Sequence, residues 1–247
     1  MSIPVKVTVI GAGSATFSLG LVKDLSLTEN LAGSHIAFMD PDVERLDLIH
    51  RLATRYVDEL GSKVTFEKTT DRDAALQDAD FVINVAGLEY QHSDERRAIL
   101  RKHGYYSGPN FPVGYMMNLP LMLETAQAIE RICPDAWLIQ SGNPVREGTP
   151  LITQQTNAKV IGLCHGHYGY INVAKVLGID PDRVVWTAPG LNHCIWLTEF
   201  RYEGADAYPI LDAWIENEAE AYWRHWEEYP EERRAEIEAF YAGEPER

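Results

Sequence analysis

The sequence predicts an α/β fold in which a doubly wound, parallel β-sheet is covered by helices on both faces. Strand patterns alternate with helix patterns through the first two thirds of the chain, as expected for repeated strand–helix–strand units. The strand patterns are short and rich in apolar residues, and repeated strand–helix–strand units imply a parallel sheet covered on both faces. The first of these patterns ends in Gly-x-Gly, directly before a helix pattern. Together these observations predict a parallel sheet whose first connection is a tight glycine turn.

Six apolar runs are the expected strands of this sheet: residues 5–10, 35–40, 64–69, 81–87, 137–140 and 160–163. Five segments between them carry helix patterns: residues 14–27, 41–60, 93–103, 121–132 and 149–155. Asp40 and Pro41 suit the start of the second helix, and Gly61 suits its end. The segment 105–120 indicates a loop, because it is rich in glycine, proline and aromatic residues.

The pattern changes after Pro189. Residues 184–188 indicate a seventh strand, residues 193–204 a further strand, and residues 207–240 a long helix rich in tryptophan. The helical spacing of its tryptophans predicts packing against a neighbouring element. An acidic, aromatic helix also suits a contact with a second subunit, and we expect a homo-oligomer.

Composition excludes several classes of function. The chain has 247 residues, of which 45% are hydrophobic and 24% charged, an ordinary balance for a globular protein. Its net charge of −15 argues against nucleic-acid binding, which needs a basic surface. Three widely spaced cysteines argue against a disulfide framework and for a reducing compartment. No signal peptide and no apolar run of membrane-spanning length is present. We therefore expect a cytoplasmic protein without a membrane partner.

The segment "VTVIGAGSATF" carries the first functional signal. Gly11 permits a tight turn, and Gly13 lets the backbone approach a pyrophosphate at the helix N-terminus, as in a Rossmann-type fold. Thr16 stands where the usual fingerprint has a third glycine. Asp40, at the end of the second strand, suits the ribose hydroxyls of NAD and disfavours the 2′-phosphate of NADP. The alternative is a tight turn that binds no phosphate.

Two further strand ends carry small or polar residues. Ala86 and Gly87 follow the fourth strand, and small residues there allow a nucleotide to pass, although close packing explains them equally well. Asn143 precedes Pro144 after the fifth strand. A proline disfavours helical backbone at the preceding residue. The Asn143 amide would therefore lie near the nicotinamide end of such a cleft, unless the pair is an ordinary turn.

Cys164 ends the sixth strand pattern in "IGLCHGHYGY", and His193 follows the seventh strand pattern in "GLNHC". If both strands belong to one parallel sheet, both side chains reach the same crevice. A thiolate and an imidazole suit a divalent transition metal, with open positions for a substrate. The alternative is a buried cysteine that acts as a small apolar residue. His165 and His167 could transfer protons or contact the metal ligands. The alternative is that they are ordinary surface residues.

These segments together resemble glycoside hydrolase family 4, the NAD- and metal-dependent glycosidases that share the fold of lactate and malate dehydrogenases. The resemblance rests on "IGAGSATFSLGLVKDL", on Asp40, on Asn143-Pro144, on "CHG" at 164–166 and on "LNH" at 191–193, and it keeps their order and spacing over essentially the whole chain. It implies a dinucleotide-binding domain over residues 1–190. Residues 191–247 would then begin a lactate-dehydrogenase-like, C-terminal substrate domain.

The resemblance also implies roles for individual residues. Cys164 and His193 are expected to bind Mn²⁺ or another divalent transition metal. Asn143 is expected to contact the sugar, and His165 to act in catalysis. His165 stands where relatives that act on phosphorylated sugars have an aspartate, so the Cys-His-Gly form resembles the α-galacturonidase or α-glucuronidase group. The expected NAD-binding residues share the strand ends at the sheet edge: Gly11, Gly13, Ser14, Asp40, Ala86 and Gly87.

The chemistry that the resemblance implies begins with oxidation of the sugar at C3 by NAD⁺. Elimination of the C1 leaving group, addition of water and return of the hydride follow, with no net redox change. Family members are longer than this chain, so a C-terminally truncated form is expected, and no catalytic base is assigned. The alternatives are a lactate- or malate-type dehydrogenase without a metal, and a non-catalytic NAD-binding fragment. No convincing Asp-x-x-Arg with a suitably spaced histidine supports the dehydrogenase.

Overall fold

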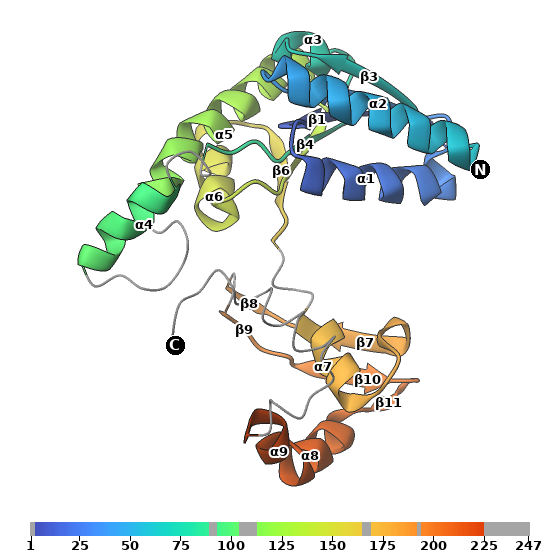
Figure 1. Ribbon diagram of the computed structural model, residues 1–247, viewed down its shortest axis with the longest axis vertical. Coiled ribbons are helices and arrows are strands. Elements are labelled where there is room, and N and C mark those ends of the chain that lie inside the picture. The colour runs from blue at the N-terminus through green and yellow to red at the C-terminus, as the bar shows by residue number, and fades with distance from the viewer. Residues whose placement is uncertain (1–2, 89–92, 104–112, 165–168, 192–193, 225–247) are drawn as a thin grey trace. The chain divides into compact units, whose positions relative to one another are not determined.

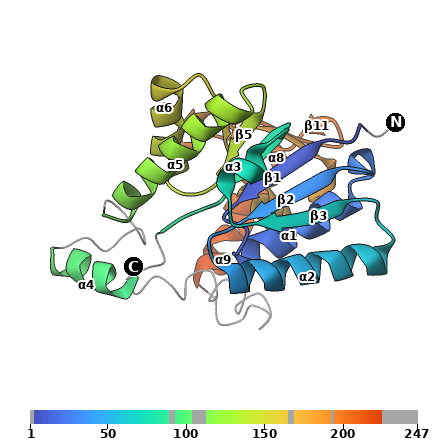
Figure 2. The same cartoon turned by 90° about the horizontal axis from the view of Figure 1, so that it is seen from above.

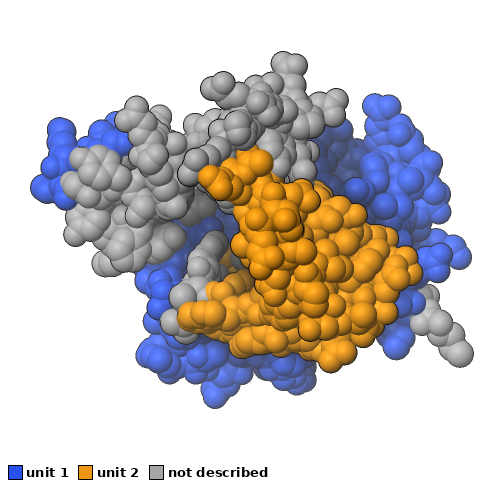
Figure 3. Space-filling model, turned by 90° about the horizontal axis from the view of Figure 1, so that it is seen from below, with its two compact units in different colours: residues 1–163 blue, residues 164–247 orange. Residues whose placement is uncertain are grey.

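A computed structural model describes residues 3–88, 93–103, 113–164, 169–191 and 194–224 (Figure 1). The chain forms two compact units, residues 1–163 and 164–247, which Figure 3 colours separately. In the described part of the chain, no helix combines the length and the apolar character that a membrane crossing requires.

The first unit is built on a six-stranded sheet in the order β3-β2-β1-β4-β5-β6. Every pair of neighbouring strands is parallel. The strands are β1 (Lys6–Ile10), β2 (His35–Met39), β3 (Thr65–Thr69), β4 (Phe81–Asn84), β5 (Trp137–Gln140) and β6 (Lys159–Gly162). This is the strand order of dinucleotide-binding folds, in which the direction of winding reverses between β1 and β4. The predicted doubly wound, Rossmann-type sheet is confirmed.

One face of the sheet is covered by α1 (Ala15–Leu27) and α2 (Val43–Leu60), which lie side by side in Figure 2. Val7 and Val9 of β1 point to this face, where they join a buried apolar cluster with Val22 of α1 and Ile49 of α2. A short 3₁₀ helix, Glu29–Leu31, follows α1. Because a central strand alternates its side chains between the two faces, the neighbouring Ile10 joins a different cluster.

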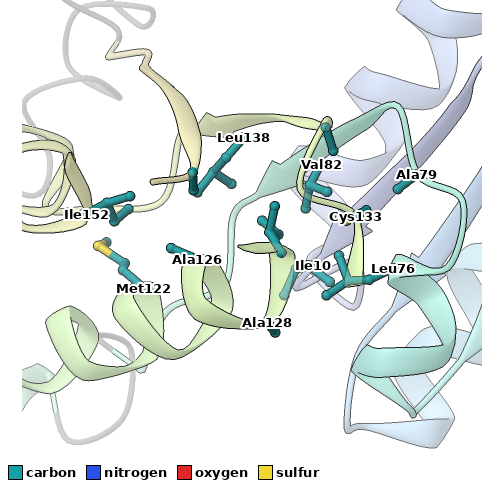
Figure 4. Close-up of a cluster of buried hydrophobic side chains, with 13 residues drawn as sticks. Ile10, Leu76, Ala79, Val82, Met122, Ala126, Ala128, Cys133, Leu138 and Ile152 are labelled. Atoms are coloured by element: carbon teal, nitrogen blue, oxygen red, sulfur yellow. The ribbon is translucent and has the colours of Figure 1, made fainter. Parts of the chain in front are cut away.

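The opposite face is covered by α3 (Arg72–Leu76), α5 (Val113–Ile132) and α6 (Val145–Gln155). Figure 4 shows their cluster, in which Met122 of α5 lies beside Ile152 of α6. A Cβ added at Gly148 would lie 2.4 Å from the Met122 sulfur, so the glycine permits α6 to pack closely on α5. The helix α4 (Ser93–Lys102) precedes α5.

Three predicted helix starts are wrong. The N-cap of α2 is Asp42 rather than the predicted Asp40, because the Asp42 carboxylate accepts the Glu44 and Arg45 N–H groups and the helix begins at Val43. α5 begins at Val113 inside the predicted loop and continues through Pro120, and its residues in the buried apolar cluster begin at Met122. α6 begins directly after Pro144 rather than at Thr149.

Among its described residues, the second unit contributes no strand to the parallel sheet. β7 (Val184–Thr187) pairs antiparallel with β10 (Glu199–Tyr202), which also pairs with β11 (Ala205–Asp206). β8 (Gly190–Leu191) and β9 (Cys194–Ile195) form a separate two-stranded sheet. The prediction of one strand over residues 193–204 is therefore wrong, since β9 and β10 belong to different sheets.

Helices complete the second unit: α7 (Gly169–Leu177), the 3₁₀ helix Pro181–Arg183, α8 (Tyr208–Asn217) and α9 (Ala219–Arg224). The predicted helix over 207–240 is interrupted at Glu218, whose backbone is not helical. The Asn217 side chain donates to the Ala213 carbonyl at 2.7 Å and so satisfies a backbone group at the end of α8. Trp214 contacts Tyr222 across the break, with ring centroids 5.4 Å apart. The rest of the predicted helix lies outside the described residues.

Two glycines, one before α1 and one inside it, give a test of the fold. Gly11 has φ +91°, and a Cβ there would lie 2.6 Å from the Ala86 Cα, whereas a Cβ at Gly20 inside α1 meets nothing within 4 Å. Gly11→Ala is expected to lower the free energy of unfolding by about 2 kcal/mol or more. Gly20→Ala is expected to raise it by about 0.5–1 kcal/mol, as alanine favours helix. Urea unfolding midpoints that move in the same direction for both variants would contradict this account.

Candidate functional site

The site is built where the winding of the sheet reverses, at the carboxyl ends of β1 and β4. The Val85 N–H donates to the Ile10 carbonyl at 2.9 Å, so the two strand ends stay paired to their last residues. Gly11 then turns away with its N–H bonded to the Met39 carbonyl of β2 at 2.9 Å. A Cβ at Gly11 would collide with the backbone of Ala86. Only glycine allows the backbones after β1 and β4 to pass this closely.

Asp40 organises the second half of the glycine turn. Its Oδ2 accepts the Gly13 N–H at 2.8 Å, and its Oδ1 accepts the Asp42 N–H at 2.9 Å. A Cβ at Gly13 would lie 2.8 Å from the Asp40 Cγ. Gly13 therefore has a role beyond the predicted one, because it lets a carboxylate touch the backbone of the turn.

The N-terminus of α1 follows directly. Ser14 is the N-cap residue, and its side chain makes no capping hydrogen bond to the first turn. The N–H groups of the first helical turn have no partner inside a helix. With the positive end of the helix dipole, they favour an anion at this point.

A pair of buried amides joins the ends of β4 and β5. Asn84 and Gln140 are register partners on these strands, and both are fully buried. The Asn84 Nδ2 donates to the Gln140 Oε1 at 2.9 Å, and the Asn84 Oδ1 accepts the Ala86 N–H at 3.2 Å. The Gln140 Nε2 donates to the Gly142 carbonyl at 2.8 Å. The pair therefore shapes the backbone after both strands.

The backbone after β5 crosses close to the backbone after β4. The Gly142 N–H donates to the Asn84 carbonyl at 2.8 Å, and a Cβ at Gly142 would lie 2.9 Å from the Ala86 carbonyl oxygen. Asn143 follows, with an exposed side chain and a cis peptide bond to Pro144. Its backbone carbonyl accepts the Asn118 Nδ2 of α5 at 2.8 Å.

The structure brings most of the predicted residues to one edge of the sheet. Gly11 lies against Ala86, Gly13 lies against Asp40, and Gly142, the neighbour of Asn143, also lies against Ala86. Gly87 is exposed and follows Ala86 directly. The predicted NAD-binding residues and Asn143 thus follow the ends of adjacent strands, and their binding roles remain predictions.

The predicted metal ligands belong to the second unit. Cys164 is half-buried and is its first residue, while His193 lies outside the described residues, as do His165 and His167. The reasoning that paired Cys164 with His193 through neighbouring parallel strands is wrong, because β7 pairs with β10 rather than with β6. The proposed metal site therefore rests on the family resemblance.

Three buried amides of this region were not singled out by the sequence analysis: Asn84, Gln140 and Asn118. A signal for the first two exists, since a polar residue that ends an otherwise apolar, buried strand needs an internal partner. Asn118 carries no such signal, because its segment looks like a loop and its two partners are distant in the sequence.

The chain also matches known proteins along most of its length. Residues 6–179 match the family model for family 4 glycosyl hydrolases, and residues 188–242 match the model for the C-terminal domain of the same family. An α-galactosidase of Bacillus subtilis is 32% identical over 83% of this chain and 50% of its own length. An α-galacturonidase of Lachnoclostridium phytofermentans is 29% identical over 93% of this chain and 51% of its own length. The chain thus spans about half the length of these curated relatives.

Solved structures agree on the fold. A 6-phospho-α-glucosidase from gut microorganisms, solved in complex with NAD and Mn²⁺, superposes with a TM-score of 0.75 at 20% identity, over 87% of this chain and 51% of that one. A lactate dehydrogenase from Eimeria maxima superposes with a TM-score of 0.62 at 15% identity, over 86% and 61% of the two chains. Both support the predicted dehydrogenase-like architecture. Given the family match over residues 6–179, the chain belongs to glycosyl hydrolase family 4.

Proposed function

We propose that this protein is an NAD- and metal-dependent glycosidase that cleaves an α-glycoside or an α-uronide. The observation that carries the proposal is the match to family 4 glycosyl hydrolases over both segments of the chain. The glycine turn, Asp40 and the open N-terminus of α1 support it, because they form a cradle of the kind that dinucleotides occupy.

The residues present fit NAD. The first turn of α1 would hold the pyrophosphate through its N–H groups, and Gly11 and Gly13 keep that approach clear of side chains. The Asp40 carboxylate, held by two backbone N–H groups, keeps lone pairs that would accept the ribose hydroxyls. A bound NAD⁺ would supply reversible removal of a hydride from the sugar.

The donor chemistry of the metal ligands fits a divalent transition metal. Cys164 would supply a thiolate and His193 an imidazole, a set that suits several such ions. Mn²⁺ is the first choice, because a structural neighbour with the same fold was solved with NAD and Mn²⁺. When bound, the metal would act as a Lewis acid on the sugar oxygens.

The chain's own residues would orient the sugar and move protons. Asn143 has an exposed amide beside the turn after β4, where it would donate to or accept from a sugar hydroxyl. His165 directly follows Cys164 and would transfer a proton at the glycosidic oxygen. We further propose that residues 1–190 form the nucleotide-binding part. Residues 191–247 would belong to the substrate-binding part. The homo-oligomer also remains a proposal.

We propose an α-galacturonide or α-glucuronide as the substrate class. Two relatives are α-galacturonidases, each 29% or less identical to this chain but similar over more than four fifths of it. His165 in place of an aspartate favours an unphosphorylated sugar, as in the Cys-His-Gly group. The competing α-galactoside has support from the Bacillus subtilis relative.

A panel of p-nitrophenyl α-glycosides and α-uronides tests the activity. The full-length gene product is assayed with NAD⁺, Mn²⁺ and a reducing agent. It is expected to release nitrophenol with a turnover rate of roughly 1 per second. NADH should not accumulate, because the hydride returns in each turnover. Accumulating NADH would instead identify a lactate- or malate-type dehydrogenase, and binding of NAD without any turnover would identify a non-catalytic module.

Asp40 is expected to set the cofactor preference. Asp40→Ala should weaken NAD binding about 10- to 100-fold, since a hydrogen bond to a charged group is lost. It should also narrow the preference over NADP, whose 2′-phosphate would meet the Asp40 carboxylate. Fluorescence titration with both cofactors measures the two effects, and Asp24→Ala, an exposed aspartate on α1, is the control. Equal affinities of the natural protein for NAD and NADP would contradict this role of Asp40.

Cys164 is expected to bind the metal, and Cys133 offers a matched control. Cys133 is only 7% exposed in the core, and burial raises the pKa of its thiol above the ordinary value, which disfavours a thiolate ligand. Cys164→Ser and His193→Ala should each abolish Mn²⁺ binding by calorimetry and Mn²⁺ activation, with NAD affinity unchanged. Cys133→Ala should leave all three unchanged. Normal Mn²⁺ binding by Cys164→Ser would contradict the metal-ligand role and leave Cys164 as a structural residue.

A further inference from the structure

Asn118 connects two loops of the site from a third element. It lies on α5 and is fully buried. Its Oδ1 accepts the Leu88 N–H at 2.7 Å, and its Nδ2 donates to the Asn143 carbonyl at 2.8 Å. The oxygen and the nitrogen of this one side-chain amide thus each bond to a backbone group that is distant from Asn118 in the sequence.

The two loops carry the residues proposed to meet the cofactor and the substrate. Leu88 directly follows Ala86 and Gly87, while Asn143 carries the amide proposed to contact the sugar. The Asn143 side chain is exposed, so packing around that side chain does not define its position. Its placement depends on its backbone, whose carbonyl is held by Asn118.

The other contacts of these loops hold different atoms. The Asn84 and Gln140 pair bonds to Ala86 and Gly142, one residue before Gly87 and one before Asn143. Asn118 acts further along each loop, two residues beyond Ala86 at Leu88 and one residue beyond Gly142 at Asn143 itself. The two sets of amides therefore complement each other, and only the Asn118 contacts extend to the residue that would touch the sugar.

We propose that Asn118 is a positioning residue, which sets the distance between the cofactor-side loop after β4 and the substrate-side loop after β5. This inference rests on the proposed glycosidase function of the same site. Its effect on turnover follows from geometry, because displacing a reacting group by about 1 Å costs about 100-fold in rate. Asn118 itself touches neither cofactor nor sugar in this account.

Two substitutions separate its two bonds. In N118D, assayed at a pH at which the introduced carboxyl is ionised, the side chain keeps an acceptor for the Leu88 N–H but has no donor for the Asn143 carbonyl. In N118L both bonds are lost at similar volume. Thr125→Val is the matched control, since Thr125 is equally buried on the same helix and its hydroxyl bonds only within α5, to the Leu121 carbonyl at 2.8 Å.

The kinetic result expected is a fall in kcat of between about 10- and 100-fold for N118D and N118L. The Kd for NAD should stay within about threefold in N118D, because the cofactor-side bond is retained, and should rise further in N118L. Thr125→Val should change neither quantity. A loss of folded protein lowers the apparent kcat and leaves the Kd for NAD unchanged, so kcat is calculated per NAD-binding site titrated in each variant. A fall in kcat that persists after this normalisation distinguishes positioning from a loss of stability.

Amide hydrogen exchange tests the contact without any activity. The Leu88 N–H should exchange slowly in the natural protein, in N118D and in Thr125→Val, and at least about fivefold faster in N118L. If no glycoside is turned over, the proposed function has failed, and the exchange result alone judges the contact. Equal exchange at Leu88 in all four proteins, or normal kcat in N118L with active enzyme, would overturn the role of Asn118.

Discussion

The site depends on a close approach of three backbone segments at the carboxyl ends of β1, β4 and β5. Gly11 and Gly142 both lie so near Ala86 that a Cβ at either position would enter another residue's backbone. Hydrogen bonds hold paired strands at a fixed spacing, whereas the loops that follow the strands can diverge. Here the loops stay together, and backbone lies directly against backbone where Gly11 and Gly142 meet Ala86.

Buried amides make this close approach possible. Peptide groups that leave a sheet lose their ladder partners, and a buried N–H or carbonyl without a partner is unfavourable. Asn84 and Gln140 supply partners for the first residues of the two loops. Their mutual hydrogen bond leaves both amides well satisfied inside an apolar core. The same arrangement that stabilises the loops fixes the surface that a ligand would meet.

Much of the first unit follows from local sequence, whereas the second unit does not. Short strand patterns identify all six parallel strands, and Gly11 marks the turn, because these signals are confined to a few adjacent residues. The start of α5 is hidden by Gly114 and Pro120, two residues that local sequence reasoning assigns to a loop. β7 looks like another strand of the same sheet because its sequence does not encode its partner. The link from Asn118 to Leu88 and Asn143 depends on tertiary structure in the same way.

The contacts of Asp40 bear on how the cofactor preference of such a protein can change. The carboxylate expected to discriminate between the two dinucleotides also anchors Gly13 and Asp42. A mutation to a side chain without an acceptor oxygen removes the anchor together with the charge, so a gain of tolerance for the extra phosphate then coincides with a looser turn. A neutral side chain that keeps an acceptor oxygen, such as asparagine, separates the two effects in part, because one oxygen remains for the two backbone N–H groups. The path by which the cofactor preference changes is thus constrained by the turn as well as by the cofactor.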